Sequence, residues 1–416
     1  MSSKERIVLL LLAGINFTHI MDFMIMMPLG NYLMPYFNIS SQQFSMLVAA
    51  YTFSAGASGF FAAFFADNYD RKRILLFGYI GFLLGTLCCA LAPSYLFLFA
   101  SRIVAGIFGG LIGAQVLSIV SDLIPYERRG MAMGWVMASF SVASVFGVPF
   151  GLYVANQFNW HGPFFFVVGL GALLVPMIIS YLPKVDAHLR NSSKRISPLE
   201  LIKGIGRDEN QRLALALSAC LMLGHFMIIP FLNPFMEFNK GFSKTQTPLM
   251  YMVGGALTLV SSPILGRIAD KVGKTRLFVI LVMLAVIPIA LITNLPDIPF
   301  YLVLCITGFW FIVSSGRSIP AHAMISNVVE PERRGSFMSF NSSIQQIFVG
   351  IASVLAGFIV VNTPSQKVLN YEVTGYISIG IILFSIVIVT RLTNRMKKKE
   401  LKTVAKEAPA KAEEVL

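Results

Sequence analysis

Charged residues are scarce in this chain of 416 residues. Only 13% of the residues are Asp, Glu, Lys or Arg, against roughly 25% in a typical soluble domain. Hydrophobic residues make up 56%, and the mean hydropathy is +0.73. A soluble fold has no interior large enough for so much apolar surface. The composition therefore excludes an ordinary soluble protein and indicates a chain embedded in lipid.

Several functional motifs are also missing from the sequence. It contains no GxxxxGK[ST] loop for ATP, and no polar segment long enough to form a nucleotide-binding domain. Its 5 His and 4 Cys show no spacing typical of metal ligands. No nucleophile stands beside a base in a recognisable pattern. We therefore expect no ATP-driven pump, no enzyme, no metal site and no other cofactor.

Long uncharged segments fill most of the chain, and each exceeds the roughly 20 residues that a helix needs to cross a bilayer. Charges, Pro, Gly and polar clusters divide them into twelve predicted membrane spans. The spans are approximately residues 7–35, 43–66, 74–92, 97–121, 131–156, 163–183, 213–236, 247–268, 276–294, 299–325, 335–361 and 371–393. The predicted fold is all-α and integral to a membrane.

Lys and Arg lie mainly on one set of connections, at 71–73, 128–129, 271–276 and 333–334. Cytoplasmic loops retain positive charge, so these loops and both termini are expected on the cytoplasmic side of the membrane. The membrane is expected to be a bacterial-type inner membrane. The same distribution accounts for the net charge of +13. We therefore expect the protein to be surrounded by membrane lipid. The positive charge does not require a nucleic acid partner.

Two segments recur at nearly one spacing. Residues 63–73 match 266–276 at an offset of 203 residues, and 121–130 match 326–335 at an offset of 205. Copies of six spans each keep the same membrane orientation, so we expect two six-helix bundles that face each other across a central cavity. The predicted divisions are an N-terminal bundle at 1–183, a cytoplasmic linker at 184–212, a C-terminal bundle at 213–393 and a cytoplasmic tail at 394–416.

The repeated loops resemble the signature loop of the major facilitator superfamily. In the first copy Asn68 replaces the usual Arg and Asp70 replaces the second Gly. Residues 98–110 resemble the arginine-and-glycine motif of the family, and 147–151 resemble a variant of its antiporter motif in which Gly and Pro are not adjacent. The resemblance covers essentially the whole chain. It implies a monomeric transporter of the twelve-span drug and sugar efflux group, which exchanges a small-molecule substrate for protons.

The recurring Asp of these loops predicts a gate, because a carboxylate at a helix end can cap a neighbouring helix and pair with Arg. An ordinary positive cytoplasmic loop would explain the basic residues but not the Asp. The predicted gating residues are Asp67, Arg71, Arg73, Asp270, Lys274 and Arg276, with partners across the bundles from Glu127, Arg128, Glu332 and Arg333.

Asp22 is the only acid of the first predicted span, about 22 Å along the helix from Arg6. A carboxylate at that depth is energetically unfavourable unless it is protonated, paired with a cation or in contact with water. Asp22 is therefore a candidate for proton coupling. The alternative is an Asp that only ties two helices together. Arg102, at a similar depth, is expected to set the pKa of the acid or hold a polar substrate. The alternative is that the long Arg102 side chain extends to the membrane–water interface on the outer side.

The second half contributes Arg317, a candidate for substrate binding or counter-charge. His19 and His225 are candidates for proton relay, although an intramembrane His often makes only a helix-to-helix hydrogen bond. The sequence leaves open whether they and His322 face the cavity. Gly and Pro residues at short spacing allow close helix packing and a bend in the fifth span. These residues are Gly106, Gly110, Gly147, Pro149 and Gly151.

The resulting hypothesis is a secondary active transporter that exports a small molecule such as a drug, sugar or metabolite in exchange for protons. Uptake by symport is the main alternative, and a sensor that binds ligand without transport is the next. A channel is less favoured because the chain contains its own two-bundle repeat. The sequence does not identify the substrate.

Overall fold

The computed structural model describes residues 3–65, 69–125, 128–186, 198–329, 334–364 and 366–413. Within these residues, twelve helices are long and apolar enough to cross a membrane. This confirms the predicted all-α membrane fold. Every predicted span overlaps one of the twelve.

The first six spans have these bounds: α1 (Ser3–Ile25), α3 (Ser41–Phe65), α4 (Arg71–Ala90), α5 (Tyr95–Leu123), the joined segments α6 (Arg129–Val142), η3 (Ala143–Gly147) and α7 (Val148–Gln157), and α8 (Gly162–Tyr181). A short helix, α2 (Gly30–Phe37), lies between α1 and α3. The segment η3 is a π-helical turn that ends two residues before Pro149, which cannot donate a backbone hydrogen bond.

The other six spans have these bounds: α11 (Glu209–Phe226) with α12 (Ile229–Pro234) and η4 (Phe235–Asn239), α13 (Thr247–Val272), α14 (Lys274–Thr293), α15 (Phe300–Ser326), α16 (Arg334–Ile359) and α17 (Tyr371–Glu413). The short helix α10 (Pro198–Arg207) precedes them. Strands β1 (Val361–Asn362) and β2 (Val368–Leu369) form an antiparallel pair between α16 and α17.

Two predicted spans are broken rather than continuous. The first, expected over 7–35, ends as α1 at Ile25, and α2 begins beyond Pro28. The seventh, expected over 213–236, ends as α11 at Phe226, and α12 begins next to Pro230. Proline removes a backbone donor and disfavours helix in the residue before it. The two prolines are 202 residues apart, so the break belongs to the repeat.

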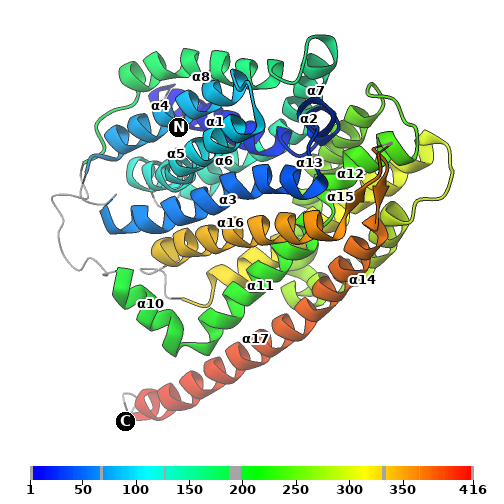
Figure 1. Cartoon of the computed structure of the whole chain (residues 1–416). Coiled ribbons are helices and arrows are strands. Elements are labelled where there is room, and N and C mark those ends of the chain that lie inside the picture. The colour runs from blue at the N-terminus through cyan, green and yellow to red at the C-terminus, as the bar shows by residue number, and fades with distance from the viewer. Residues whose placement is uncertain are drawn as a thin grey trace.

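Helices of each half pack mainly on one another. In the first half α4 packs against α5 and α8, and α1 packs against α6 and α8; in the second half α15 lies against α13 and α14, and α17 against α11 and α14. Figure 1 shows the N-terminus and α10 at one end of the molecule, and α2, α12 and the strands at the other. We call these the near end and the far end.

The two halves meet chiefly where α3 packs against α16. At the far end of this seam a side chain added at Gly357 would collide with Ser45, and toward the near end the rings of Phe60 and Phe340 lie 5.8 Å apart. Small residues allow this close approach. A second seam joins α13 to η3 and α7. In this conformation the halves therefore touch along most of α3, rather than standing apart.

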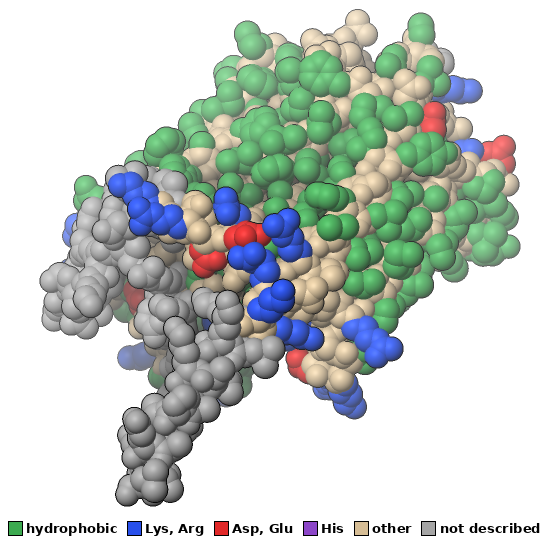
Figure 2. Space-filling view, turned by 90° about the horizontal axis from the view of Figure 1, so that it is seen from below, with side chains coloured by type: hydrophobic (Ala, Val, Ile, Leu, Met, Phe, Trp, Pro, Cys, Tyr) green, Lys and Arg blue, Asp and Glu red, His purple; other side chains and the backbone are tan. Residues whose placement is uncertain are grey.

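Large apolar side chains cover the outside of the helices. Phe77, Leu96 and Phe158 are 65%, 72% and 79% exposed. On the face seen in Figure 2, hydrophobic side chains cover the flank, and the described Lys and Arg side chains gather toward one end. Lipid is the solvent in which such a surface is stable. The chain is thus a multi-pass membrane protein.

Candidate functional site

Asp22 and Arg102 form an ion pair inside the first half. Arg102 Nη1 lies 2.8 Å from Asp22 Oδ2, and the two side chains are 1% and 0% exposed. Thr86 Oγ1 of α4 donates to Asp22 Oδ1 at 3.3 Å. Each charge compensates the other, which is what makes two ionised groups tolerable at this depth. The acid of α1 is thereby bound to both α4 and α5.

Polar atoms without partners surround this pair. The guanidinium of Arg102 lies 4.3 Å from the ring centroid of Tyr51 on α3. Among the described residues, the Tyr51 hydroxyl, both ring nitrogens of His19 and Arg102 Nε are buried without a hydrogen-bond partner. Buried polar atoms normally have a partner in protein or water. The pair and these orphaned atoms form the first-half site, of which Tyr51 and Thr86 were not predicted.

Arg317 occupies a contrasting position in the second half. Its side chain is 1% exposed, and its Nε and Nη1 atoms have no partner among the described residues. His225 of α11 stacks on Trp310 of α15 with ring centroids 5.0 Å apart. His225 and His19 are 206 residues apart, close to the repeat spacing. The second half therefore repeats the His and also contains a buried Arg, although Arg317 is 215 residues from Arg102 and so lies off the repeat spacing. It has no acid like Asp22 among the residues described.

A carboxylate at the far end joins the two halves. Glu237 of η4 accepts hydrogen bonds from Asn31 of α2, from Thr247 Oγ1 at 2.7 Å and from Asn233 Nδ2 at 3.4 Å. Asn233 also donates to the carbonyl of Pro28 at 2.9 Å. The Asn and Thr partners are at most 1% exposed. The sequence analysis did not predict this network. An acid and two Asn residues close to the proline breaks could have indicated it.

The surroundings of Glu237 are aromatic and basic. Lys244 Nζ lies 4.3 Å from the ring centroid of Tyr32. Burial, and after it the negative charge of Glu237, raises the pKa of the Tyr32 phenol above its usual range. The hydroxyl of Tyr251 also has Glu237 as a charged neighbour. Beside this group is a pocket of about 430 Å³ whose lining includes Tyr32, Tyr36, Trp160, His161 and Lys244.

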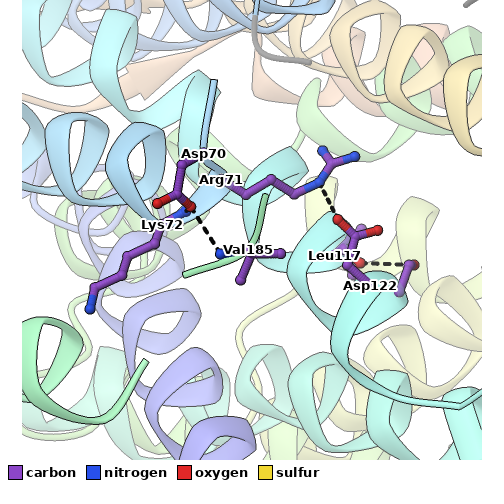
Figure 3. A network of polar contacts seen from close by, with 7 residues as sticks. Asp70, Arg71, Lys72, Leu117, Asp122 and Val185 are labelled. Carbon is purple, nitrogen blue, oxygen red and sulfur yellow. Dashed lines mark hydrogen bonds and ion pairs between the residues drawn. The ribbon is translucent and has the colours of Figure 1, made fainter. Parts of the chain in front are cut away.

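At the near end, Asp70 has a capping role; Asp67 lies outside the described residues. Asp70 Oδ1 accepts from the backbone N–H of Lys72 and of Val185, each at 3.0 Å, which caps α4 and fixes the chain after α8 (Figure 3). Arg71 Nε lies 2.6 Å from Asp122 Oδ2 on α5. The contacts of this latch named here join elements of the first half.

Among the described residues, no other predicted gating residue forms an ion pair across the halves. Arg128 pairs with Glu5 of α1 at 3.1 Å, because α1 begins beside the start of α6. A partner for Arg128 across the bundles stays a prediction. Asp67, Glu127, Glu332 and Arg333 lie outside the described residues. Four further predicted residues are exposed and form no ion pair among the described residues: Arg73, Asp270, Lys274 and Arg276.

The predicted glycines lie at helix contacts. Side chains at Gly106 and Gly110 would collide with the carbonyls of Tyr51 and Ala55 on α3, and one at Gly151 would lie 2.7 Å from Ile25. Gly147 ends the π-helical turn before Pro149. His322 lies on α15 and is half-buried. The glycines bring α3 and α5 together and so place Tyr51 under Arg102.

Comparison with known proteins assigns the family. The sequence profile of the Major Facilitator Superfamily matches residues 12–319. The chain therefore belongs to this superfamily of secondary transporters, which confirms the predicted family and fold. The match includes the Asp22–Arg102 pair and Arg317.

Individual relatives share a low percentage of identical residues with this chain. The uncharacterised MFS-type transporter YwfA of Bacillus subtilis is 26% identical over 77% of this chain and 75% of its own length. Multidrug resistance protein 3 of Bacillus subtilis is 32% identical over 45% of this chain and 36% of its own length. A solved D-xylose–proton symporter superposes with a TM-score of 0.72 at 16% identity, covering 92% of this chain and 96% of its own. The last similarity shows the shared fold.

Proposed function

We propose that this protein exports a small molecule in exchange for protons, by alternating access of a site between its two halves. The observation that carries the proposal is the Asp22–Arg102 pair, a carboxylate and its counter-ion fully buried in a transporter fold. An intramembrane acid of this kind marks an ion path in many transporters. The proposed transport uses no nucleotide and no catalytic step.

The Asp22–Arg102 pair provides a way to couple proton binding to the conformation of the protein. Both oxygens of Asp22 are bound here, one by Arg102 and one by Thr86. A proton reaches Asp22 only when this pair separates, and its arrival removes the charge that holds α1 to α5. The conformation with the pair closed is therefore favoured without the proton, and the other conformation with it. A substrate that competes for Arg102 exchanges with the proton.

The far-end contact supplies a gate for this cycle. Opening the far end requires the hydrogen bond from Asn31 to Glu237 to break, along with the packing between Ser45 and Gly357. We propose that residues 1–183 and 213–393 rock against each other about the substrate site. The near end, with both termini, faces the cytoplasm, the membrane is a bacterial inner membrane, and the protein acts as a monomer.

Efflux is favoured by the similarity to a multidrug resistance protein and by the antiporter-like segment at Gly147–Gly151. Uptake by symport is the alternative, since a D-xylose–proton symporter has the same fold. A ligand sensor without flux is the third possibility. Flux under an imposed pH gradient separates them, because efflux and uptake run in opposite directions relative to the protons.

The test uses the full-length protein in proteoliposomes that contain a pH-sensitive dye, with ethidium as a drug-like probe and radiolabelled xylose as a sugar probe. We expect probe movement that depends on the pH gradient, and its loss in Asp22→Asn. Asp297→Asn is the matched control, since Asp297 is 96% exposed at the far end. Gradient dependence that is unchanged in Asp22→Asn would remove Asp22 from the mechanism.

A further inference from the structure

The guanidinium of Arg317 is buried without a counter-charge. In the first half, Arg102 has Asp22 at 2.8 Å. In the second half, no acidic side chain among the described residues pairs with Arg317, and its Nε and Nη1 atoms are unpartnered. A buried charge without a partner is among the least favourable arrangements in a protein. Such an arrangement is retained where something that binds there supplies the missing charge.

The polar atoms around Arg317 can all donate hydrogen bonds. Trp310, Ser314 and Arg317 are four and then three residues apart on α15, so they lie along one face of that helix. His225 stacks on Trp310 from α11 and has Arg317 as a charged neighbour. Trp310 Nε1, Ser314 Oγ and His225 Nδ1 are buried and unpartnered among the described residues. The cluster thus presents several donors, and no carboxylate among the described residues accepts from them.

Aromatic rings surround this cluster and connect it to the other half. Phe226, next to His225, packs edge-on against the His225 ring at 5.3 Å and lies 5.8 Å from Phe23 of the first half. Phe311 packs edge-on against Trp310 at 5.2 Å. The donors therefore lie directly behind an apolar contact that separates when the halves rock apart.

We propose that Arg317, His225, Trp310 and Ser314 bind the carboxylate of the transported solute, so that the substrate is a small organic anion with an apolar, preferably aromatic, body. The planar fork of Arg matches the two oxygens of a carboxylate, and its bonds to that group are charge-assisted. The indole N–H and the Ser hydroxyl supply further donors. The aromatic rings bind the body of the solute. This inference rests on the proposed function only in treating the bound anion as the transported solute.

The experiment compares matched acids and amides on the full-length protein in detergent. The probes are benzoate with benzamide, phenylacetate with phenylacetamide and indole-3-acetate with indole-3-acetamide, and the readouts are the unfolding temperature and a titrated Kd. We expect at least one acid to stabilise the protein while its amide does not. In Arg317→Gln that acid binds about tenfold to a hundredfold more weakly, since a charge-assisted bond is worth about one to two powers of ten.

Two further variants keep the result interpretable. Arg317→Lys retains the charge without the fork and should keep part of the acid preference. Arg267→Gln removes an exposed Arg of α13 and should bind like the parent. If Arg317→Gln does not fold, Arg317→Lys and Ser314→Ala provide the test: each should weaken the acid and leave its amide unaffected.

The proposal is overturned if no acid is preferred to its amide in the parent protein, or if the preference persists undiminished in the Arg317 variants. These outcomes are distinct from failure of the proposed function. Acid binding without gradient-driven flux of that acid, of ethidium or of xylose would leave the site and remove the transporter mechanism, whereas flux of ethidium or xylose without acid preference would do the reverse.

Discussion

Asn31 of α2 donates a hydrogen bond to Glu237 of η4, so an amide of the first half binds a carboxylate of the second. The two residues are 206 positions apart in the chain. Both follow the proline break of their own half, at Pro28 and at Pro230. The repeat has therefore placed complementary groups on the two sides of one contact.

Glu237→Gln is expected to weaken the far-end closure, because a neutral amide is a poorer acceptor for the two Asn and Thr247 than a carboxylate. Spin labels at Phe158 and Leu369, which are 79% and 46% exposed, would report the distance between the halves. We expect a larger distance in the variant. Asp297→Asn is the control, and a distance that stays at the parental value would separate Glu237 from the gate.

The same contact should respond to pH. A protonated Glu237 has less acceptor capacity than a carboxylate, so the far end should open as the sample is acidified from neutral to mildly acidic pH. Tyr32, Lys244 and Tyr251 face Glu237, and Tyr and Lys side chains generally keep their protons in this range. Glu237→Gln should abolish the response. Histidines do titrate there, so His161→Asn, in the adjacent pocket, is the control; a response lost in that variant would assign it to His161 instead.

Arg102→Gln is expected to lower the free energy of unfolding by about 3–5 kcal/mol, because it leaves Asp22 buried without its counter-ion. The double variant Asp22→Asn with Arg102→Gln should be less destabilised than Arg102→Gln alone, since no charge is then left unpaired. Denaturant unfolding of all variants in detergent gives the coupling free energy. Effects that simply add would contradict a direct ion pair.

Gly110→Val is expected to destabilise the first half by about 1–3 kcal/mol, because the new side chain collides with the backbone of Ala55. Gly113→Val provides the comparison: it lies one turn further on α5, carries the same β-branched cost, and has no atom within 4 Å of the added Cβ. Thermal unfolding should separate the two variants. Equal losses would mean that the contact between α3 and α5 is not tight.

Asp70→Ala is expected to cost about 1–2 kcal/mol of stability, since it removes the cap of α4 and the bond to Val185. Asp270→Ala changes the corresponding acidic loop of the second half, where Asp270 is exposed and has no ion pair among the described residues. We expect no measurable change from that variant. Comparable unfolding temperatures for the two would refute the capping role of Asp70.

The sequence by itself determined the membrane fold, the twelve spans and the two-half repeat. Each of these depends on a property that is local or periodic along the chain: uncharged stretches of bilayer length, basic loops and matching segments at one offset. Asp22 and Arg102 could also be selected from the sequence, because an ionised group in an apolar segment is conspicuous wherever it lies.

Only the tertiary structure decided which groups meet. A similar depth made Asp22 a candidate partner for Arg102, but no pattern in the sequence indicated that Arg317 lacks an acidic partner among the described residues. The same holds for the contact of Asn31 with Glu237, and for Asp70 as the cap of α4. Contacts between helices far apart in the chain depend on how each helix is rotated and where glycines such as Gly110 let it approach, and no local pattern specifies that.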